Sequence, residues 1–484
     1  MSDWKLHTPN GVNDVLPAEC AVKKEIENTI WTVFASFGYK EVETPSFEYY
    51  DCYSGERGQI TQEKLYKFFD EQGRILALRP DFTTSIARMA ATKASNEITP
   101  IRYMYTGSVY RAEHTEGVRN REITQSGIEL IGSYSPKADA EVIVAAMEAV
   151  TALGIDEFSM EIGQVGFFNG LVEQLGLDEA TTEMLRESID SKNSSGIKNI
   201  VNNLDIDEDI KQLMIDLPYL FGDVDIIDRA DVKGLNETSK AALDNLRKIY
   251  ELLTLYGFEQ YISLDLGMLQ SIDYYTGSIF KCYTRGVGFP IAAGGRYDNL
   301  MGGFGKTMGA VGCAIGINRI MQIYKGESAS VASTLVFAQE DADGLAYELI
   351  SSLRINGCLC EMYLGDSFPS SLEYAKGTDN TCILRVFADK KLMIYDLDRD
   401  ETIETDLDTF MGYDDMFEEP IGEETPQDMG FRQFLGEENT RENEILDSCI
   451  GKGQTCRIGN GYIHRNRNGL LGNERELQKA CIYR

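Results

Sequence analysis

The chain has 484 residues, of which 43% are hydrophobic and 26% are charged. This length predicts two or three domains with a substantial interior, and no apolar run reaches the roughly 18 residues that a membrane span needs. The 46 Lys and Arg against 78 Asp and Glu give a net charge of −32, and such a surface repels a phosphate backbone unless a local basic patch overrides it. We therefore expect a soluble protein that binds neither membrane nor nucleic acid.

The ten cysteines and three histidines indicate no metal site. The cysteines lack the paired C-x-x-C spacing of zinc sites, and His7, His114 and His464 lie far apart in the sequence. Residues 1–9 lack the apolar core of a secretory signal. We expect reduced thiols, no metal or other cofactor, and a cytoplasmic location.

The first part of the chain predicts an α+β domain on a largely antiparallel sheet. Residues 19–37 show apolar residues at helical spacing and stop before Gly38. Residues 39–47 alternate as a strand, and Pro45 suits an edge or a dimer interface. Short turns then join further strands, which favours antiparallel pairing. These strands are expected at residues 65–69, 74–78, 102–110, 121–131 and 158–162.

Helical periodicity replaces strand signals at about residues 165–256, which predicts an all-helical insert. The sheet then resumes, and a final helix is expected to close the domain. The expected elements are helices at 167–175, 180–188 and 238–253, strands at 262–266 and 278–283, and the closing helix at about 312–324.

A small, polar linker at residues 326–333 predicts the start of a second unit, a small α/β domain. The chain beyond residue 410 is acidic through Glu444 and then basic, with weak periodicity. We predict a core domain 1–325, a small α/β domain 326–410 and a tail or adapter 411–484. The second domain is expected to have strands at 334–338, 358–363, 382–387 and 391–396 and helices at 341–356 and 372–376.

Asp81 and Thr83 stand where a strand ends and a helix begins. A carboxylate and a hydroxyl placed there can face a common cavity and hold an ammonium group. The alternative is that one of them only caps the helix.

Arginines mark two further places. Arg111 and Arg119 lie at the two ends of a long loop, where guanidinium groups suit a phosphate or a carboxylate, or else pair with nearby acids. Gly294–Asp298 predicts a glycine turn with an attached guanidinium, and Gly312–Arg319 places another arginine at a helix beside a glycine-bearing strand. Both could approach a polar ligand, although a plain surface turn and a packed helix explain them as well.

Gln125, Gly127 and Glu129 share one face of a predicted strand, because strand side chains alternate. A glutamate in such a strand usually faces solvent. The matching amide and the glycine between them favour the floor of a ligand site instead.

Several segments together resemble the histidyl-tRNA synthetase family over roughly the first 325 residues. Within that family, the Leu78–Thr84 and Gln125–Gly132 sequences are more similar to the ATP phosphoribosyltransferase regulatory subunits, which are catalytically silent relatives of the synthetases. The segments that carry the resemblance are Gly11–Pro17, Gly38–Glu48, Tyr110–Gly132, Asp273–Gly277, Gly294–Leu300 and Gly312–Arg319.

The resemblance implies a class II synthetase-like fold and a histidine pocket. In the synthetases an arginine before the Asp-Tyr-Tyr run takes part in amino-acid activation, whereas this chain has Gln270 before Asp273. Loss of one charge-stabilising donor commonly costs on the order of 10² to 10³ in rate. The resemblance assigns Asp81 and Thr83 to the ammonium group, Gln125 to the amino-acid backbone, Glu129, Tyr274 and Tyr275 to the imidazole, and Arg111, Arg119 and Arg319 to a residual nucleotide site.

We therefore predict a non-catalytic regulatory subunit that is required for the activity of the short-form ATP phosphoribosyltransferase catalytic subunit, in the first step of L-histidine biosynthesis. It is expected to bind L-histidine for feedback inhibition and to form a homodimer within a hetero-oligomer. The alternative is a divergent histidine-tRNA ligase, which Arg111, Arg319 and the C-terminal α/β domain favour and Gln270 and the net charge oppose. A third hypothesis is a histidine sensor with another partner.

Overall fold

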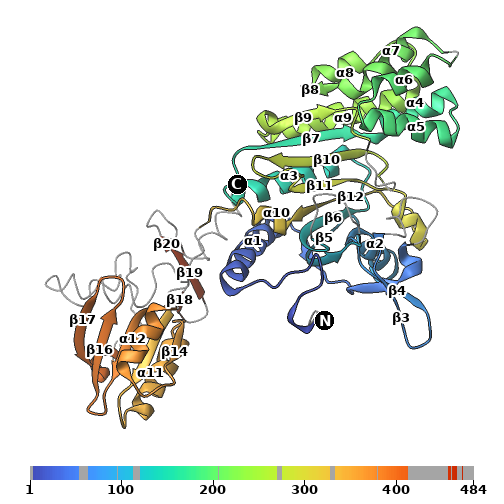
Figure 1. The fold of residues 1–484 in the computed structure, drawn as a ribbon. Helices are drawn as coiled ribbons and strands as arrows, with labels where there is room; N and C mark the ends of the chain where they lie inside the picture. Colours follow the sequence, from blue (N-terminus) through green and yellow to red (C-terminus); the bar gives the residue numbers. More distant parts are fainter. Residues whose placement is uncertain are drawn as a thin grey trace. The chain divides into compact units, whose positions relative to one another are not determined.

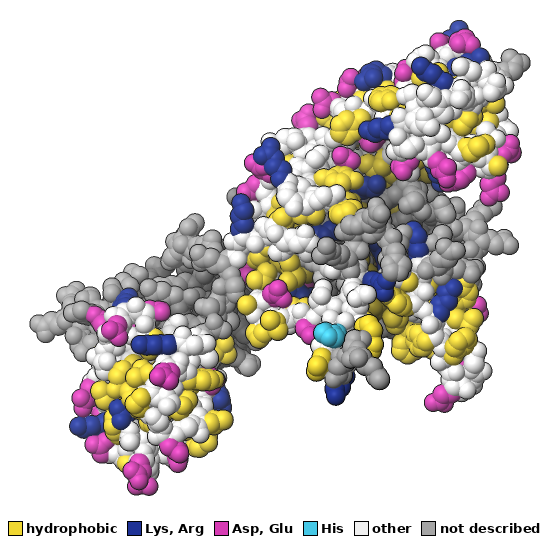
Figure 2. Space-filling model, viewed as in Figure 1, with side chains coloured by type: hydrophobic (Ala, Val, Ile, Leu, Met, Phe, Trp, Pro, Cys, Tyr) yellow, Lys and Arg dark blue, Asp and Glu magenta, His cyan; other side chains and the backbone are white. Residues whose placement is uncertain are grey.

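The computed structural model describes residues 4–53, 64–94, 96–112, 120–204, 206–269, 275–326, 333–378 and 380–411, and the backbone of residues 456–458, 461–465 and 471–472. The chain divides into two compact units, residues 1–326 and 327–484. Within the described residues, no helix combines the length and apolarity needed to cross a membrane. Acidic and basic side chains are interspersed on the face of the molecule drawn in Figure 2.

A nine-stranded sheet forms the centre of the first unit (Figure 1), in the order β1-β5-β6-β12-β11-β10-β7-β9-β8. The β1–β5 and β7–β9 pairs are parallel and the others are antiparallel. The predicted α+β fold with a largely antiparallel sheet is confirmed. The strands are β1 (Lys40–Glu41), β5 (Ile101–Tyr110), β6 (Glu122–Ile131), β7 (Phe158–Gln164), β8 (Phe221–Gly222), β9 (Ile262–Asp265), β10 (Ser278–Thr284), β11 (Ala292–Arg296) and β12 (Ala310–Gly316).

Helix α3 (Pro136–Ala152) is the most deeply buried helix of this unit, and the sequence pattern did not predict it. Pro136 occupies its first turn, and the Ser135 side chain accepts a hydrogen bond from the Lys137 backbone N–H. The helix contacts α1 (Pro17–Ser36) as well as the sheet. Because α3 is buried on nearly all sides, it lacks the amphipathic period that reveals a surface helix.

Two elements next to the candidate site differ from expectation. Residues 310–316 form strand β12 rather than the start of a closing helix, and only α10 (Ile317–Ile320) is helical there. β12 is almost entirely buried between β6 and β11, so it presents a continuous apolar run rather than alternation. The predicted glycine turn at 294–298 also begins as a strand, since Gly294 and Gly295 lie within β11.

A smaller antiparallel sheet, β2-β4-β3, leads into helix α2 (Thr83–Thr92). Its strands are β2 (Phe47–Tyr49), β3 (Lys67–Phe69) and β4 (Ile75–Leu78). The predicted strand at 39–47 is therefore divided, because β1 pairs with the large sheet and β2 with the small one. The short link from β4 to α2 places Asp81 and Thr83 beside the large sheet.

Helices α4 to α9 occupy residues 165–255 and share the main core of the first unit. Side chains cap several of their N-termini, as where Asp178 Oδ1 accepts a hydrogen bond from the Thr181 N–H (2.8 Å). The two-residue strand β8 also lies in this stretch, which the all-helical prediction did not include. The helices are α4 (Val165–Leu175), α5 (Glu179–Asp190), α6 (Ser194–Val201), α7 (Glu208–Asp216), α8 (Asp225–Ala230) and α9 (Glu237–Leu255).

The second unit contains a five-stranded mixed sheet in the order β14-β13-β15-β16-β17. Helices α11 and α12 pack on opposite faces of it, because Val336 and Leu384 face α11 whereas Phe337 and Ile383 face α12. Strand β17 and the strands after residue 455 were not predicted. The elements are β13 (Ser333–Ala338), α11 (Asp343–Ile355), β14 (Cys360–Met362), α12 (Phe368–Lys376), β15 (Asn380–Val386), β16 (Lys391–Asp396), β17 (Glu401–Asp406), α13 (Leu407–Met411), β18 (Cys456–Ile458), β19 (Gly461–Arg465) and β20 (Leu471–Gly472).

Candidate functional site

A pocket of about 220 Å³ lies over strands β6, β11 and β12 of the large sheet. Six of the residues that the sequence singled out line it, from segments far apart in the chain: Asp81, Thr83, Arg111, Gln125, Tyr275 and Arg319. Tyr274, Arg119 and Gln270 lie outside the described residues. The remaining lining residues are Tyr105, Ile123, Pro290, Ile291, Ala292, Ala293, Gly294, Tyr297, Gly312, Cys313, Ala314 and Gly316.

Glycines allow the strands beneath the pocket to pack closely. A Cβ atom added at Gly312 would overlap the Glu129 carboxylate, and one at Gly127 would overlap the Tyr105 hydroxyl. A Cβ at Gly294 would overlap the backbone of β12. Any side chain at these three positions would displace a neighbouring group, so glycine creates the room for the buried polar groups.

Glu129 lies below the pocket floor, only 1% exposed, and does not itself line the pocket. The Thr83 hydroxyl donates a hydrogen bond to Glu129 Oε1 (2.8 Å), and the Tyr297 hydroxyl donates one to Oε2. Burial raises the pKa of Glu129 to about 8, against the hydrogen bonds from Tyr297 and Thr83, which lower it. The alternative that this glutamate faces solvent is therefore wrong. Its carboxyl group is connected to the pocket by the hydroxyls of Thr83 and Tyr297, which contact it and line the pocket.

Asp81 contributes to the start of α2 and also lines the pocket. Its Oδ1 accepts a hydrogen bond from the Thr84 backbone N–H (3.0 Å), which helps to cap α2, while its side chain lines the pocket. Burial raises its pKa, and the Thr84 N–H and the Arg111 charge act in the opposite direction. Asp81 and Thr83 thus give one end of the pocket a set of oxygen acceptors.

Arg111 and Arg319 also line the pocket. Arg111 Nε donates to the Pro80 carbonyl oxygen (3.1 Å), and Arg319 Nη1 donates to that of Pro290. Neither arginine has an ion pair with a carboxylate within the part of the chain that the structure describes. Burial and the nearby Arg111 charge lower the pKa of Arg319. Because an anion between the two cations would relieve this repulsion, they suit a carboxylate or a phosphate.

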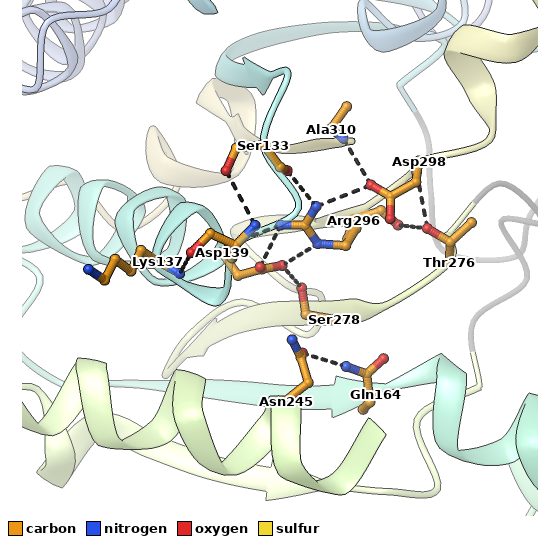
Figure 3. A network of polar contacts seen from close by, with 11 residues as sticks. Ser133, Lys137, Asp139, Gln164, Asn245, Thr276, Ser278, Arg296, Asp298 and Ala310 are labelled. Carbon is orange, nitrogen blue, oxygen red and sulfur yellow. Dashed lines mark hydrogen bonds and ion pairs between the residues drawn. The ribbon is translucent and has the colours of Figure 1, made fainter. Parts of the chain in front are cut away.

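Arg296 differs from these arginines, because its guanidinium donates all its hydrogen bonds to groups inside the protein (Figure 3). The five N–H groups of a guanidinium all find acceptors here. Nε and Nη2 bond Asp139 (3.0 and 2.6 Å), Nη1 bonds the Ser133 carbonyl and Asp298 (2.8 and 3.1 Å), and Nη2 also bonds the Ser135 carbonyl (3.4 Å). The hypothesis that the Gly294–Asp298 guanidinium approaches a ligand is therefore wrong.

Tyr105 and Tyr297 line the pocket, but the sequence reasoning did not include them among the candidate site residues. Tyr105 lies opposite Gly127 in the β5–β6 register and stacks on Phe82, with ring centroids 4.3 Å apart. The pairing of a large aromatic residue with a glycine is a usable signal, but only once the strand register is known. Tyr297 directly follows the glycine-arginine pair, and no periodicity indicates which way it points.

The described residues contain no group of three or more His, Cys, Asp or Glu side chains that could hold a metal ion. The pocket instead combines oxygen acceptors, a buried carboxyl group and two arginines in a volume suited to one small molecule with both an ammonium group and an acidic group. This site on a largely antiparallel sheet defines a protein with a class II aminoacyl-tRNA synthetase-like core.

Comparison with known proteins agrees. The family model described as histidyl-tRNA synthetase matches residues 11–320. A histidyl-tRNA synthetase from Nostoc has the same fold, with a TM-score of 0.70 at 21% identity over 85% of this chain and 99% of that one.

Closer relatives define the family more narrowly. The ATP phosphoribosyltransferase regulatory subunit of Acetivibrio thermocellus is 44% identical over 83% of this chain and 97% of its own length. That of Clostridium acetobutylicum is 40% identical over 77% and 93%. A structure from Bacillus halodurans, titled a regulatory subunit of this transferase or a histidyl-tRNA synthetase, has a TM-score of 0.70 at 30% identity over 79% and 98%. This chain belongs to the family of ATP phosphoribosyltransferase regulatory subunits.

Proposed function

We propose that this protein is a non-catalytic regulatory subunit that the short-form ATP phosphoribosyltransferase needs for activity in the first step of L-histidine biosynthesis, and that its pocket binds L-histidine for feedback inhibition. The proposal includes a cytoplasmic homodimer within a hetero-oligomer with the catalytic subunit. The observation that carries it is the convergence of acceptors and arginines on one pocket of about 220 Å³, in a chain whose relatives bear the regulatory name.

The assignment of ligand groups follows the chemistry of the pocket. Asp81 and Thr83 present oxygen atoms to the ammonium group, and Gln125 reaches the amino-acid backbone. Glu129 and Tyr275, with Tyr274, serve the imidazole, the carboxyl group acting through the Thr83 and Tyr297 hydroxyls that contact it. The imidazole N–H of histidine is a donor that an aliphatic amino acid lacks, so histidine suits such a set of acceptors better.

Gln270 in place of an arginine supports a binding role rather than amino-acid activation. Feedback inhibition requires histidine to bind the inactive arrangement of the assembly more tightly than the active one. A coupling free energy of about 1 to 3 kcal/mol shifts affinity some 5- to 150-fold. A modest rearrangement around the pocket is enough to supply it.

The direct test measures transferase activity of the short-form catalytic subunit with and without this chain, and then with increasing histidine. We expect activity only with both proteins and inhibition by histidine. Titration calorimetry should show histidine binding to wild type and at least about tenfold weaker binding to Asp81→Asn, because an amide replaces the charged acceptor. Asp228→Asn, in an exposed pair with Arg247 on the helical insert, is the matched control and should bind like wild type. Absence of binding heat with the wild-type protein would refute the histidine site.

The second candidate is a divergent histidine-tRNA ligase, favoured by the orientation of Arg111 and Arg319 toward the pocket. Histidine-dependent exchange of pyrophosphate into ATP decides between the two. A robust exchange rate would replace the regulatory proposal, whereas no exchange combined with activation of the transferase would exclude the ligase.

A further inference from the structure

Two of the tyrosines that line the pocket are close in the chain to residues that bond or directly follow Arg296. Tyr297 follows Arg296 in the chain, and its N–H donates to the Ala310 carbonyl (2.7 Å). Thr276, the residue after Tyr275, donates its N–H to the Arg296 carbonyl (2.7 Å), and its hydroxyl accepts from the Asp298 N–H (3.0 Å). The orientation of this strand end therefore bears on both tyrosines.

The Tyr275 ring has little freedom beside β11. A Cβ atom added at Gly295 would lie 2.7 Å from two carbons of that ring. The ring therefore packs closely against the Gly295 backbone, and a shift or rotation of β11 would change this contact. On the other side, Tyr297 is 1% exposed and donates its hydroxyl to Glu129, so a displaced Tyr297 would leave that buried carboxyl short of a donor.

Asp139 sets the position of the Arg296 side chain (Figure 3). It lies in the first turn of α3, is fully buried, and accepts two bonds from the guanidinium and one from the Ser278 hydroxyl (2.5 Å). The Arg296 side chain is 7% exposed. The Asp139 carboxylate thus connects the start of α3 with Ser278 at the start of β10 and with the Arg296 guanidinium at the end of β11.

Stability alone is a weak reason for such a pair. Burial of two charges costs desolvation energy, and apolar residues of similar volume often stabilise a core as well or better. A planar fork with five directed donors instead fixes orientation. We propose that Arg296 and Asp139 are positioning residues of the ligand pocket: their fork fixes the end of β11 so that Tyr275 and Tyr297 stay in place around the ligand. The effect on affinity rests on the proposed function, whereas the effect on the two rings does not.

The test compares Arg296→Lys with Arg102→Lys in the full-length protein. Lysine keeps the charge but has three donors and no fork, so it cannot serve all five acceptors around Arg296. Arg102 is a matched control, because it forms a two-bond fork with Glu141 on the same helix α3 (2.7 and 2.8 Å) and does not line the pocket. We expect Arg296→Lys to weaken histidine binding at least tenfold in calorimetry and Arg102→Lys to leave it within twofold of wild type. Circular dichroism should verify that both variants are folded at the assay temperature.

A second readout is independent of histidine. Crystal structures of wild type and Arg296→Lys in one crystal form should show the Tyr275 and Tyr297 rings displaced in the variant, and Asp139→Asn should displace them in the same direction. Rings that stay in place in both variants would overturn the inference, and so would wild-type affinity in Arg296→Lys. Equal losses in Arg102→Lys would also overturn it, since a general loosening of α3 would then explain the effect. If the wild-type protein binds no histidine, the proposed function fails while the ring positions still decide this inference.

Discussion

Arg296, the last residue of β11, and Arg319, in helix α10 directly after the neighbouring strand β12, serve opposite purposes. Arg296 has carboxylates and carbonyls for all five of its N–H groups, whereas Arg319 donates to the Pro290 carbonyl and lies over the Phe289 ring, 5.6 Å from its centroid. Arg111 resembles Arg319, with a bond to Pro80. The difference shows that a guanidinium has a structural role when the protein supplies acceptors for all its N–H groups. It remains able to bind a ligand when some of these N–H groups have no acceptor in the protein.

The largest expected effect is a loss of stability when the internally bonded arginine, Arg296, is replaced. Arg296→Met leaves the Asp139 carboxylate buried without its cation, which costs about 3 to 5 kcal/mol in the free energy of unfolding. Arg319→Met is the matched change at the pocket, and we expect it to alter stability by less than about 1 kcal/mol, because burial and Arg111 already disfavour that charge. Urea unfolding followed by circular dichroism measures both. A similar loss in the free energy of unfolding of the two variants would show that both arginines have a structural role.

The next effect concerns Gly312, which leaves room for the Glu129 carboxylate beneath the pocket. Gly312→Ala forces a Cβ into the Glu129 carboxylate, and overpacking of this kind costs about 1 to 3 kcal/mol. Gly302→Ala has open space around its Cβ and is expected to be neutral. Thermal unfolding of the two variants, with histidine titrations on the folded proteins, checks the prediction. Unchanged stability and affinity in Gly312→Ala would mean that the position of the Glu129 carboxylate does not matter for folding or for the pocket.

The last effect depends on pH and compares the buried Arg296–Asp139 ion pair with the buried carboxyl group of Glu129, which accepts hydrogen bonds from hydroxyl groups. Burial raises the pKa of Glu129 from 4.5 to about 8, so the folded protein holds this proton more strongly than the unfolded chain does. Glu129 therefore contributes stability below about pH 4.5 that is lost progressively as the pH rises to about 8, with a slope of up to about 1.4 kcal/mol per pH unit between pH 6 and 7. Glu129→Gln should remove this part of the slope in unfolding experiments at pH 5, 6, 7 and 8. An identical slope in wild type and variant would show that Glu129 is ionised throughout this range.

Local patterns predicted the outline of the fold well where a segment has one buried face. Helix α9 begins and ends within two residues of its expected bounds, because its buried residues recur at helical spacing on one face. The same reasoning failed for α3 and β12, which are buried on nearly all sides. A segment without a solvent face carries no periodic contrast, so sequence patterns could not distinguish helix from strand.

The residues of the candidate site also fall into two groups, those that sequence patterns indicated and those that they did not. Asp81, Thr83, Gln125, Arg111 and Arg319 stand out as polar residues at strand ends and beside glycines, and the structure brings these five to one pocket. Tyr105 and Tyr297 carry no such mark, and the position of Glu129 under the pocket depends on Gly312 in the neighbouring strand β12.

Composition, periodicity and motif order were enough to predict the α+β class, the family resemblance and the residue types available for an amino-acid pocket, because these are local properties of the chain. Which arginine bonds acceptors inside the protein and which remains available to a ligand became clear only from the packing of distant segments. That outcome depends on Asp139, Ser133 and Ser135, more than 150 residues before Arg296 in the chain, whose acceptors reach it only after α3 packs on the sheet.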